Sequence, residues 1–274
     1  MEQDMAYDGA ALERIAVALA LEAGRLIRDE RPIRLATDTK SSNTDVVTDM
    51  DTRSEALLHK RIAESCPQDG LLGEEGAHRV GSTGITWVVD PIDGTTNYLY
   101  DLPMYAVSVA AVVGSPAGPD WMPIAGAVHA PVLDTVWSAA AGAGARRTVS
   151  QRPDPQAIVV GTEHELSRAL VATGFGYRAE ARARQARLLT RVLPHVRDIR
   201  RCGSAAVDLC MVADGRVDAF YESGLRPWDL AAGWLIAREA GAVVTDGAGG
   251  HPGEHLVLAA NPALHESLGR LVAH

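Results

Sequence analysis

The stretch Trp87-Val-Val-Asp-Pro-Ile-Asp-Gly-Thr-Thr-Asn97 holds the densest group of chemically capable residues in this chain. It overlaps the apolar run Ile85-Thr-Trp-Val-Val89, which predicts a buried strand that delivers Asp90 at its carboxyl end. Pro91 blocks continued strand pairing and stiffens the turn. Asp90 and Asp93 can therefore converge on one point, with a main-chain carbonyl between them as a further oxygen ligand for a hard cation.

The Gly-Thr-Thr turn that follows the two aspartates suits an anion. Gly94 permits a close backbone approach, and the free amides of Gly94, Thr95 and Thr96 would face an anion if these residues open a helix. A cation and a phosphate would then share one loop. The alternative is an Asp-rich turn whose carboxylates only cap the next helix, and the motif by itself does not decide between the two.

Two other acidic motifs stand far from this stretch in the sequence. Gly73-Glu-Glu-Gly76 follows an apolar pair, and taken alone it is typical of a solvated acidic turn. Asp229, in Trp228-Asp-Leu-Ala-Ala-Gly-Trp-Leu235, lies at the expected start of a helix, where aspartate is a favoured N-cap in any helix. Neither motif carries a function without the others.

Composition limits what the protein can be. The chain has 274 residues, 47% of them hydrophobic and 22% charged, as in ordinary globular domains. Its three cysteines form no CxxC pair, so neither a disulfide framework nor a structural zinc site is expected. The formal charge of −9 repels nucleic acid and phosphorylated metabolites alike, so an anionic substrate needs a local cation. No apolar run approaches the ~20 residues of a membrane helix, and we expect a cytoplasmic protein.

Apolar spacing and turn residues predict alternating helices and strands, which indicates a layered α/β or α+β fold. The polar, proline-containing segment from Arg146 to Pro155 is the best candidate for a boundary between an N-terminal half, 1–150, and a C-terminal half, 151–274. The two halves are expected to form one catalytic unit. Helices are expected at 10–27, 52–63, 179–192, 205–213, 229–240 and 262–272, and strands at 45–48, 85–89, 105–113, 124–129, 158–161, 217–221, 242–245 and 256–259.

Taken together, these motifs resemble the inositol monophosphatase family, Mg²⁺-dependent and lithium-sensitive phosphatases of the fructose bisphosphatase-like superfamily. The resemblance rests on Gly-Glu-Glu, Asp-Pro-Ile-Asp-Gly-Thr-Thr-Asn and Trp-Asp-Leu-Ala-Ala in this order, and extends from about Lys40 to Asp246. It implies a layered αβαβα sandwich of the bacterial inositol-1-monophosphatase type, and a homodimer. Supporting segments are Lys40-Ser-Ser, Asp45-Val-Val-Thr-Asp-Met-Asp51, Gly203-Ser-Ala-Ala206 and Tyr221-Glu-Ser-Gly224.

The resemblance also implies roles for individual residues. Two to three Mg²⁺ ions would be held by Glu74, Asp90, Ile92 through its carbonyl, Asp93 and Asp229. Water positioning falls on Asp51 and Thr95, with Glu74 as a further candidate base. Electrostatics is consistent with these metal ions. Carboxylates ~4 Å apart repel by about 4 kcal/mol per pair at an effective dielectric of 20, so such a cluster needs cations. The expected substrate contacts are Asp93, Gly94, Thr95, Thr96, Gly203, Ser204, Ala205 and Glu222, and Lys40 is a candidate for steering the anion.

With no evident protein nucleophile, a metal-bound water is expected to attack phosphorus in line. The expected substrate is myo-inositol 1-phosphate, a small phosphorylated polyol. One alternative is the same chemistry on histidinol phosphate, fructose 1,6-bisphosphate or a 3′-phosphorylated nucleotide. Another, of a different class, is a non-catalytic regulatory partner of the transcription machinery, for which the Arg-rich stretch from Arg178 to Arg191 offers a basic patch.

Two further patterns are interpreted as structural. Cys210-Met-Val-Ala-Asp-Gly-Arg216 has the C-x5-R spacing of cysteine-dependent phosphatases, but the cysteine lies in an apolar helical run and Asp214 would repel phosphate. Arg226 is expected to pair with a surface acid rather than to contact a second phosphate.

Overall fold

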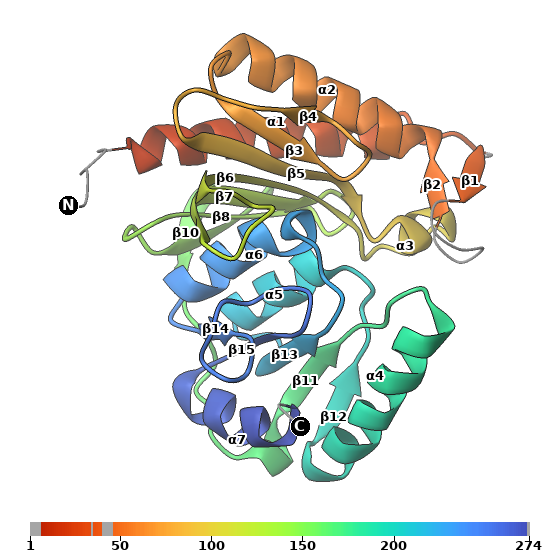
Figure 1. The fold of residues 1–274 in the computed structure, drawn as a ribbon, viewed down its shortest axis with the longest axis vertical. Coiled ribbons are helices and arrows are strands. Elements are labelled where there is room, and N and C mark those ends of the chain that lie inside the picture. The colour runs from red at the N-terminus through yellow and green to blue at the C-terminus, as the bar shows by residue number, and fades with distance from the viewer. Residues whose placement is uncertain (1–6, 34, 40–45, 273–274) are drawn as a thin grey trace.

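The structure, a computed structural model, describes residues 7–33, 35–39 and 46–272 and has five layers in the order αβαβα (Figure 1). This confirms the predicted layered sandwich. Two long helices, α1 (Gly9–Asp29) and α2 (Asp49–Ser65), form the first layer. A small antiparallel pair, β1 (Thr37–Thr39) and β2 (Val46–Thr48), precedes α2.

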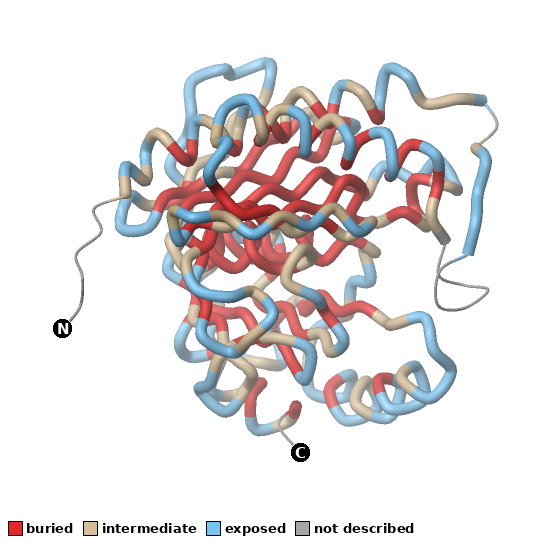
Figure 2. Tube along the Cα trace, turned by 45° about the horizontal axis from the view of Figure 1, so that its top comes forward, coloured by how far each residue is buried: buried red, intermediate tan, exposed pale blue. Residues whose placement is uncertain are grey.

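The second layer is an eight-stranded sheet in the order β10-β9-β8-β7-β6-β5-β3-β4. It is antiparallel except between β3 and β5, and Figure 2 shows its central strands as mostly buried. The short helix α3 (Thr95–Leu99) follows β5. The strands are β3 (Gly70–Gly73), β4 (His78–Arg79), β5 (Ile85–Asp93), β6 (Ala106–Gly114), β7 (Trp121–Ala130), β8 (Thr135–Ala140), β9 (Ala145–Val149) and β10 (Arg152–Ile158).

The middle layer consists of α5 (Ala205–Ala213) and α6 (Pro227–Glu239), which lie between the two sheets (Figure 1). Beyond them comes a five-stranded sheet in the order β12-β11-β13-β15-β14, and then α4 (Ala179–Val192) and α7 (Pro262–Val272). Its strands are β11 (Leu170–Thr173), β12 (Asp198–Arg200), β13 (Ala219–Glu222), β14 (Val243–Thr245) and β15 (Val257–Ala260), and single 3-10 turns lie at Leu166–Arg168 and Leu193–His195.

Three apolar cores fill the spaces between the layers. Strand β5 serves two of them, because successive side chains of a strand point to opposite faces. Trp87 packs in the core below α1 and α2, whereas its neighbour Val88 packs in the core that contains α5 and α6. The third core, with Val171 and Leu264, lies between the smaller sheet and the outer helices. Strand β5, which carries Asp90 and Asp93, is thus fixed from both sides.

Several predicted boundaries change in the structure. Strand β5 does not stop at Asp90 but continues to Asp93, because a bulge takes up the proline. Residues 159–161 are not a strand; instead β10 ends at Ile158 and pairs with β9, so the larger sheet includes residues on both sides of position 150. The division at 150 stays a prediction. In the part of the chain that is described, every helix is too short or too polar to cross a bilayer.

Candidate active site

The two aspartates of the central motif are aimed by a β-bulge. Asp90 pairs with Ser108 of β6 and Asp93 with Ala106, so β5 has one residue more than its partner over this interval. An extra residue bends a strand and re-aims its side chains. The Asp90 carboxylate then accepts a hydrogen bond from the amide of Ile92 at 3.0 Å, which holds the turn closed.

Three carboxylates meet at the end of this strand. One oxygen each of Asp90, Asp93 and Asp229 lie within 4.8 Å of one another. Asp229 comes from the first turn of α6, where it also accepts a hydrogen bond from the amide of Arg226 at 2.6 Å. Glu74, on the hairpin between β3 and β4, lines the same cavity, and its charge contributes to raising the pKa of Asp90. The structure therefore brings together all four carboxylates that the sequence motifs singled out.

Burial and mutual repulsion raise the pKa of every carboxyl group in the triad. For Asp90 and Asp229, burial raises the pKa well above its ordinary value, and the charge of Glu74 is the next largest cause. Burial raises the pKa of Asp93 to about 6, against hydrogen bonds from Ser204 and the start of α5 that lower it. Such a group of hard oxygen donors is unfavourable when ionised alone and suits a divalent cation. The residues present thus fit the metal that the family resemblance implies.

A second layer of contacts holds the expected water-positioning pair. Asp51 is completely buried, and its carboxylate accepts hydrogen bonds from the amide of Thr48 at 2.8 Å and from the hydroxyl of Thr95 at 3.0 Å. The Thr95 hydroxyl also lies 3.0 Å from the carbonyl oxygen of Ile92. Burial is the main cause that raises the pKa of Asp51, and the two threonines lower it.

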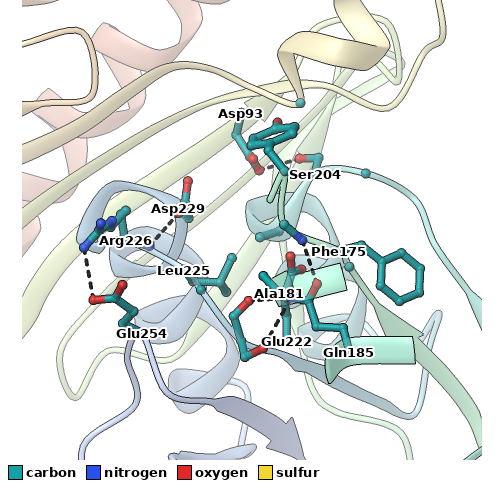
Figure 3. A pocket seen from close by; sticks show the side chains of 18 of the residues that line it. Asp93, Phe175, Ala181, Gln185, Ser204, Glu222, Leu225, Arg226, Asp229 and Glu254 are labelled. Atoms are coloured by element: carbon teal, nitrogen blue, oxygen red, sulfur yellow. Dashed lines mark hydrogen bonds and ion pairs between the residues drawn. The ribbon is translucent and has the colours of Figure 1, made fainter. Parts of the chain in front are cut away.

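The triad, Glu74, Ile92 and Thr95 border a cavity of about 1010 Å³, whereas Asp51 lies behind Thr95 and does not line it. Figure 3 shows Asp93 bonded to Ser204 on one side of it, and Asp229 beside Arg226 on another. Of the predicted substrate contacts, Thr96 does not line the cavity, and Lys40 lies outside the described residues. Those that do line it are Asp93, Gly94, Thr95, Gly203, Ser204, Ala205 and Glu222.

The two halves of the chain touch backbone to backbone beside this cavity. Gly94 has a φ of 95°, and a Cβ atom there would lie 2.9 Å from the Met104 carbonyl and 3.0 Å from that of Gly203. Asn97 donates from its amide to the carbonyl of Cys202 at 2.8 Å. Glycine at position 94 and asparagine at position 97 thus join β5 and α3 to the loop before α5.

Other residues of the cavity were not recognised in the sequence. They belong to the loop after β11, to one face of α4 and to the loop after β12, and no local motif marks them. Two glycines, Gly174 and Gly176, are the one signal that could have pointed to a close approach, since a Cβ at Gly174 would lie 2.0 Å from the Glu222 carboxylate. The unrecognised lining residues include Phe175, Tyr177, Arg178, Arg184, Gln185 and Arg201.

The patterns interpreted as structural behave as expected. The Cys210 side chain is fully buried in α5, which raises its pKa well above the ordinary value, so it does not supply a thiolate. Arg216 pairs with Asp214 at 3.3 Å. Arg226 forms an ion pair with Glu254 at 3.1 Å, and both side chains are exposed, as expected for a pairing with a surface acid (Figure 3).

Comparison with known proteins gives a consistent result. The family model described as "Inositol monophosphatase family" matches residues 8–274. The inositol-1-monophosphatase SuhB of Mycobacterium tuberculosis is 47% identical over 94% of this chain and 92% of its own length. A solved structure of M. tuberculosis SuhB covers 97% of this chain and 96% of that one with a TM-score of 0.80. The Nus factor SuhB of Escherichia coli is 38% identical over 86% of this chain and 85% of its own.

The fold and the acidic cluster, together with these similarities, define the class of protein, a phosphatase that hydrolyses phosphate esters. Within that class, the chain belongs to the inositol monophosphatase family. The resemblance inferred from the motifs is thereby confirmed. Members of this family generally use divalent metal ions, which agrees with the donor set of the cavity.

Proposed function

We propose that this protein hydrolyses inositol 1-phosphate to inositol and phosphate in a Mg²⁺-dependent reaction. The observation that carries the proposal is that one carboxylate oxygen each of Asp90, Asp93 and Asp229 lie within 4.8 Å of one another, although β5 and α6 are far apart in the sequence. With Glu74 and the carbonyl of Ile92, they would hold two to three ions. When bound there, Mg²⁺ would lower the pKa of a water ligand and stabilise the leaving oxygen.

In this proposal Thr95 and Asp51 guide the proton of the attacking water. Thr95 has one hydroxyl proton, and donating it to Asp51 leaves its oxygen free to accept a proton from water. Asp51, with a raised pKa and full burial, is a better base than an ordinary aspartate. Glu74, beside Asp90 in the cavity, is the further candidate base.

The rest of the cavity would recognise the polyol. Glu222 lies across from the triad, and its pKa is raised well above normal, chiefly by burial and then by the charge of Asp208. A carboxyl group there could bond substrate hydroxyls, and Gly203 and Ser204 line the same cavity. The M. tuberculosis relative, 47% identical, is named an inositol-1-monophosphatase, which supports inositol 1-phosphate over histidinol phosphate, fructose 1,6-bisphosphate and 3′-phosphonucleotides.

A substrate panel tests the proposal directly. Phosphate release from these four substrate types is measured with Mg²⁺ and with EDTA, for the unchanged protein and for Asp93→Asn. We expect kcat/KM to be highest for inositol 1-phosphate and activity to disappear in EDTA and in the variant. Equal rates on all substrates would refute the inositol assignment, and metal-independent release would refute the mechanism. Asp120→Asn, an exposed loop change, is the control.

A second candidate function is binding to the transcription machinery. It is favoured by the name of the E. coli relative, a Nus factor, and by exposed arginines on α4 such as Arg182, Arg187 and Arg191. Asp93→Asn separates the two functions, because a binding role should survive the loss of phosphatase activity. The homodimer remains a proposal, for which light scattering in solution is the test.

A further inference from the structure

One face of α2 contacts three separate segments of the site. Asp51 bonds Thr95, and the hydroxyl of Ser54 donates to the carbonyl of Pro91 at 3.2 Å. Glu55, one residue further, contacts the hairpin that carries Glu74. Positions 51, 54 and 55 share a face of the helix because residues three and four apart are neighbours. Beyond them the same face is apolar, with Leu58 and Ile62 in the core under the helix.

The Glu55 carboxylate uses both of its oxygens on the hairpin backbone. Oε2 accepts from the amide of Glu75 at 2.7 Å, and Oε1 accepts from the amide of Ala77 at 2.8 Å. Glu55 is only 5% exposed, so these two backbone amides provide the hydrogen bonds that water would give to an exposed carboxylate. Hydrogen bonds to an ionised acceptor are shorter and stronger than neutral ones, and two bonds fix orientation as well as distance.

The hairpin is built around this contact. The amide of Gly73 donates to the carbonyl of Ala77 at 2.7 Å, which closes the tip that holds Glu74 and Glu75. A Cβ atom at Gly73 would lie 2.3 Å from the Glu55 carboxylate, so the residue before Glu74 must be glycine for the carboxylate to reach the tip. The tip is therefore held by α2 on one side while Glu74 faces the cavity on the other.

We propose that Glu55 is a positioning residue that sets Glu74 in place for metal binding, an inference that rests on the proposed function. A ligand on a hairpin tip loses conformational freedom when it binds an ion, and a tip ordered beforehand loses less. Without the Glu55 carboxylate, the amides of Glu75 and Ala77 would lack their acceptors and the tip would move to find others. Groups that hold metal ligands from behind typically change metal affinity by about 10- to 100-fold.

The test is Glu55→Gln, which keeps the shape of the side chain but puts an amide NH₂ against one of the two backbone donors. Mg²⁺ binding is measured by calorimetry without substrate, together with thermal unfolding and the Mg²⁺ dependence of phosphate release. We expect about tenfold weaker Mg²⁺ binding or more, with activity partly restored at high Mg²⁺. Glu64→Gln, an exposed glutamate on the same helix, is the matched control and should bind Mg²⁺ like the unchanged protein.

A second variant approaches the same contact from the hairpin. Gly73→Ala should push the Glu55 carboxylate away from the hairpin and so weaken Mg²⁺ binding, as Glu55→Gln does. If Glu55→Gln does not fold, the Mg²⁺ affinity of Gly73→Ala tests the positioning role instead. A lower melting temperature with unchanged Mg²⁺ affinity in these variants would overturn the inference, since it would show a merely structural role. If instead the unchanged protein releases no phosphate with Mg²⁺, the proposed function fails, whatever the variants do.

Discussion

The hydroxyl of Thr95 and the carboxylate of Asp51 are 3.0 Å apart, although 44 residues separate them in the chain. The contact links the first turn of α3 to the first turn of α2, and both groups are buried. Thr95 in turn lies within hydrogen-bond distance of the carbonyl of Ile92, at the edge of the triad. The proposed path of a proton thus runs away from the cavity into the first layer of the fold.

Replacement of Thr95 by valine removes this path without changing the side chain's shape. General-base assistance contributes about 10²- to 10⁴-fold to a rate, so we expect kcat to fall by about 100-fold or more. Mg²⁺ affinity should change little, because the four carboxylates remain. Steady-state phosphate release measures the effect, with Thr190→Val on the exposed side of α4 as a control. A kcat near that of the unchanged protein would remove Thr95 from the mechanism.

The triad predicts opposite effects of pH with and without metal. In EDTA, the folded pKa of Asp93, about 6, exceeds its ordinary value of 3.8, so the folded state holds the proton more tightly. Stability should therefore fall as pH rises from about 4 through 6, and further as Asp90 and Asp229 ionise. Excess Mg²⁺ should raise the melting temperature at pH 7.5 and much less at pH 5, where protons compete. An equal Mg²⁺ effect at both values would contradict this.

Asp208 in α5 predicts a pH effect that needs no metal. Burial raises its pKa to about 8, and one of its carboxylate oxygens has no hydrogen-bond partner among the described residues. Because the folded pKa is above the ordinary 3.8, stability is lost as pH rises toward 8, by about 1.4 kcal/mol per pH unit for one proton.

Asp208→Asn should therefore remove this loss. Urea unfolding at pH 6 and pH 8 should show the variant gaining roughly 2 kcal/mol on the unchanged protein between the two values. Asp120→Asn, in an exposed loop, should show no such gain. A constant difference between Asp208→Asn and the unchanged protein would mean that Asp208 is ionised in the folded state throughout.

The close approach at Gly94 is testable by adding one methyl group. Gly94→Ala combines a left-handed φ with a Cβ about 3 Å from two carbonyl oxygens, so we expect a loss of several kcal/mol of stability together with activity. Gly142→Ala is the matched control, because Gly142 has a φ of 75° but open space around its Cβ position. Chemical unfolding of both variants isolates the contact between the halves, and equal losses would show that only the φ angle matters.

Much of the fold was predictable where the residues repeat with a clear period. The helices at 179–192, 205–213 and 262–272 have the predicted bounds, since apolar residues and flanking prolines or glycines define them. The edge strand β10 and its neighbour β9 are not predictable from the sequence, because β10 is exposed and β9 has mostly polar, half-buried side chains, so no apolar alternation marks them. The bulge at Pro91 is not predictable from the sequence either, because a proline, which lacks an N–H donor, ordinarily ends strand pairing.

The site was predictable as far as its motifs reach. Asp90, Asp93 and Asp229 stand in distinctive strings of residues, and the structure brings them together. Glu55 stands in an ordinary amphipathic helix, where an acid every few residues usually faces solvent. Asp208 is a single acid in the apolar run of α5, and no motif around it indicates a role. Only the packing of α2 on the hairpin and of α5 between the sheets turns these two acids inward.

The middle layer of α5 and α6 has a consequence for how this protein fails. The Asp93 carboxylate of β5 accepts hydrogen bonds from Ser204 and Ala206 at the start of α5, and Asp229 lies in the first turn of α6. The ions would therefore be held by the larger sheet and by the middle layer at once. Neither layer by itself supplies all of the carboxylates. If these layers separated, phosphatase activity would be lost together with the packing between them. Two fragments cut near position 158 would each be inactive until they reassociate.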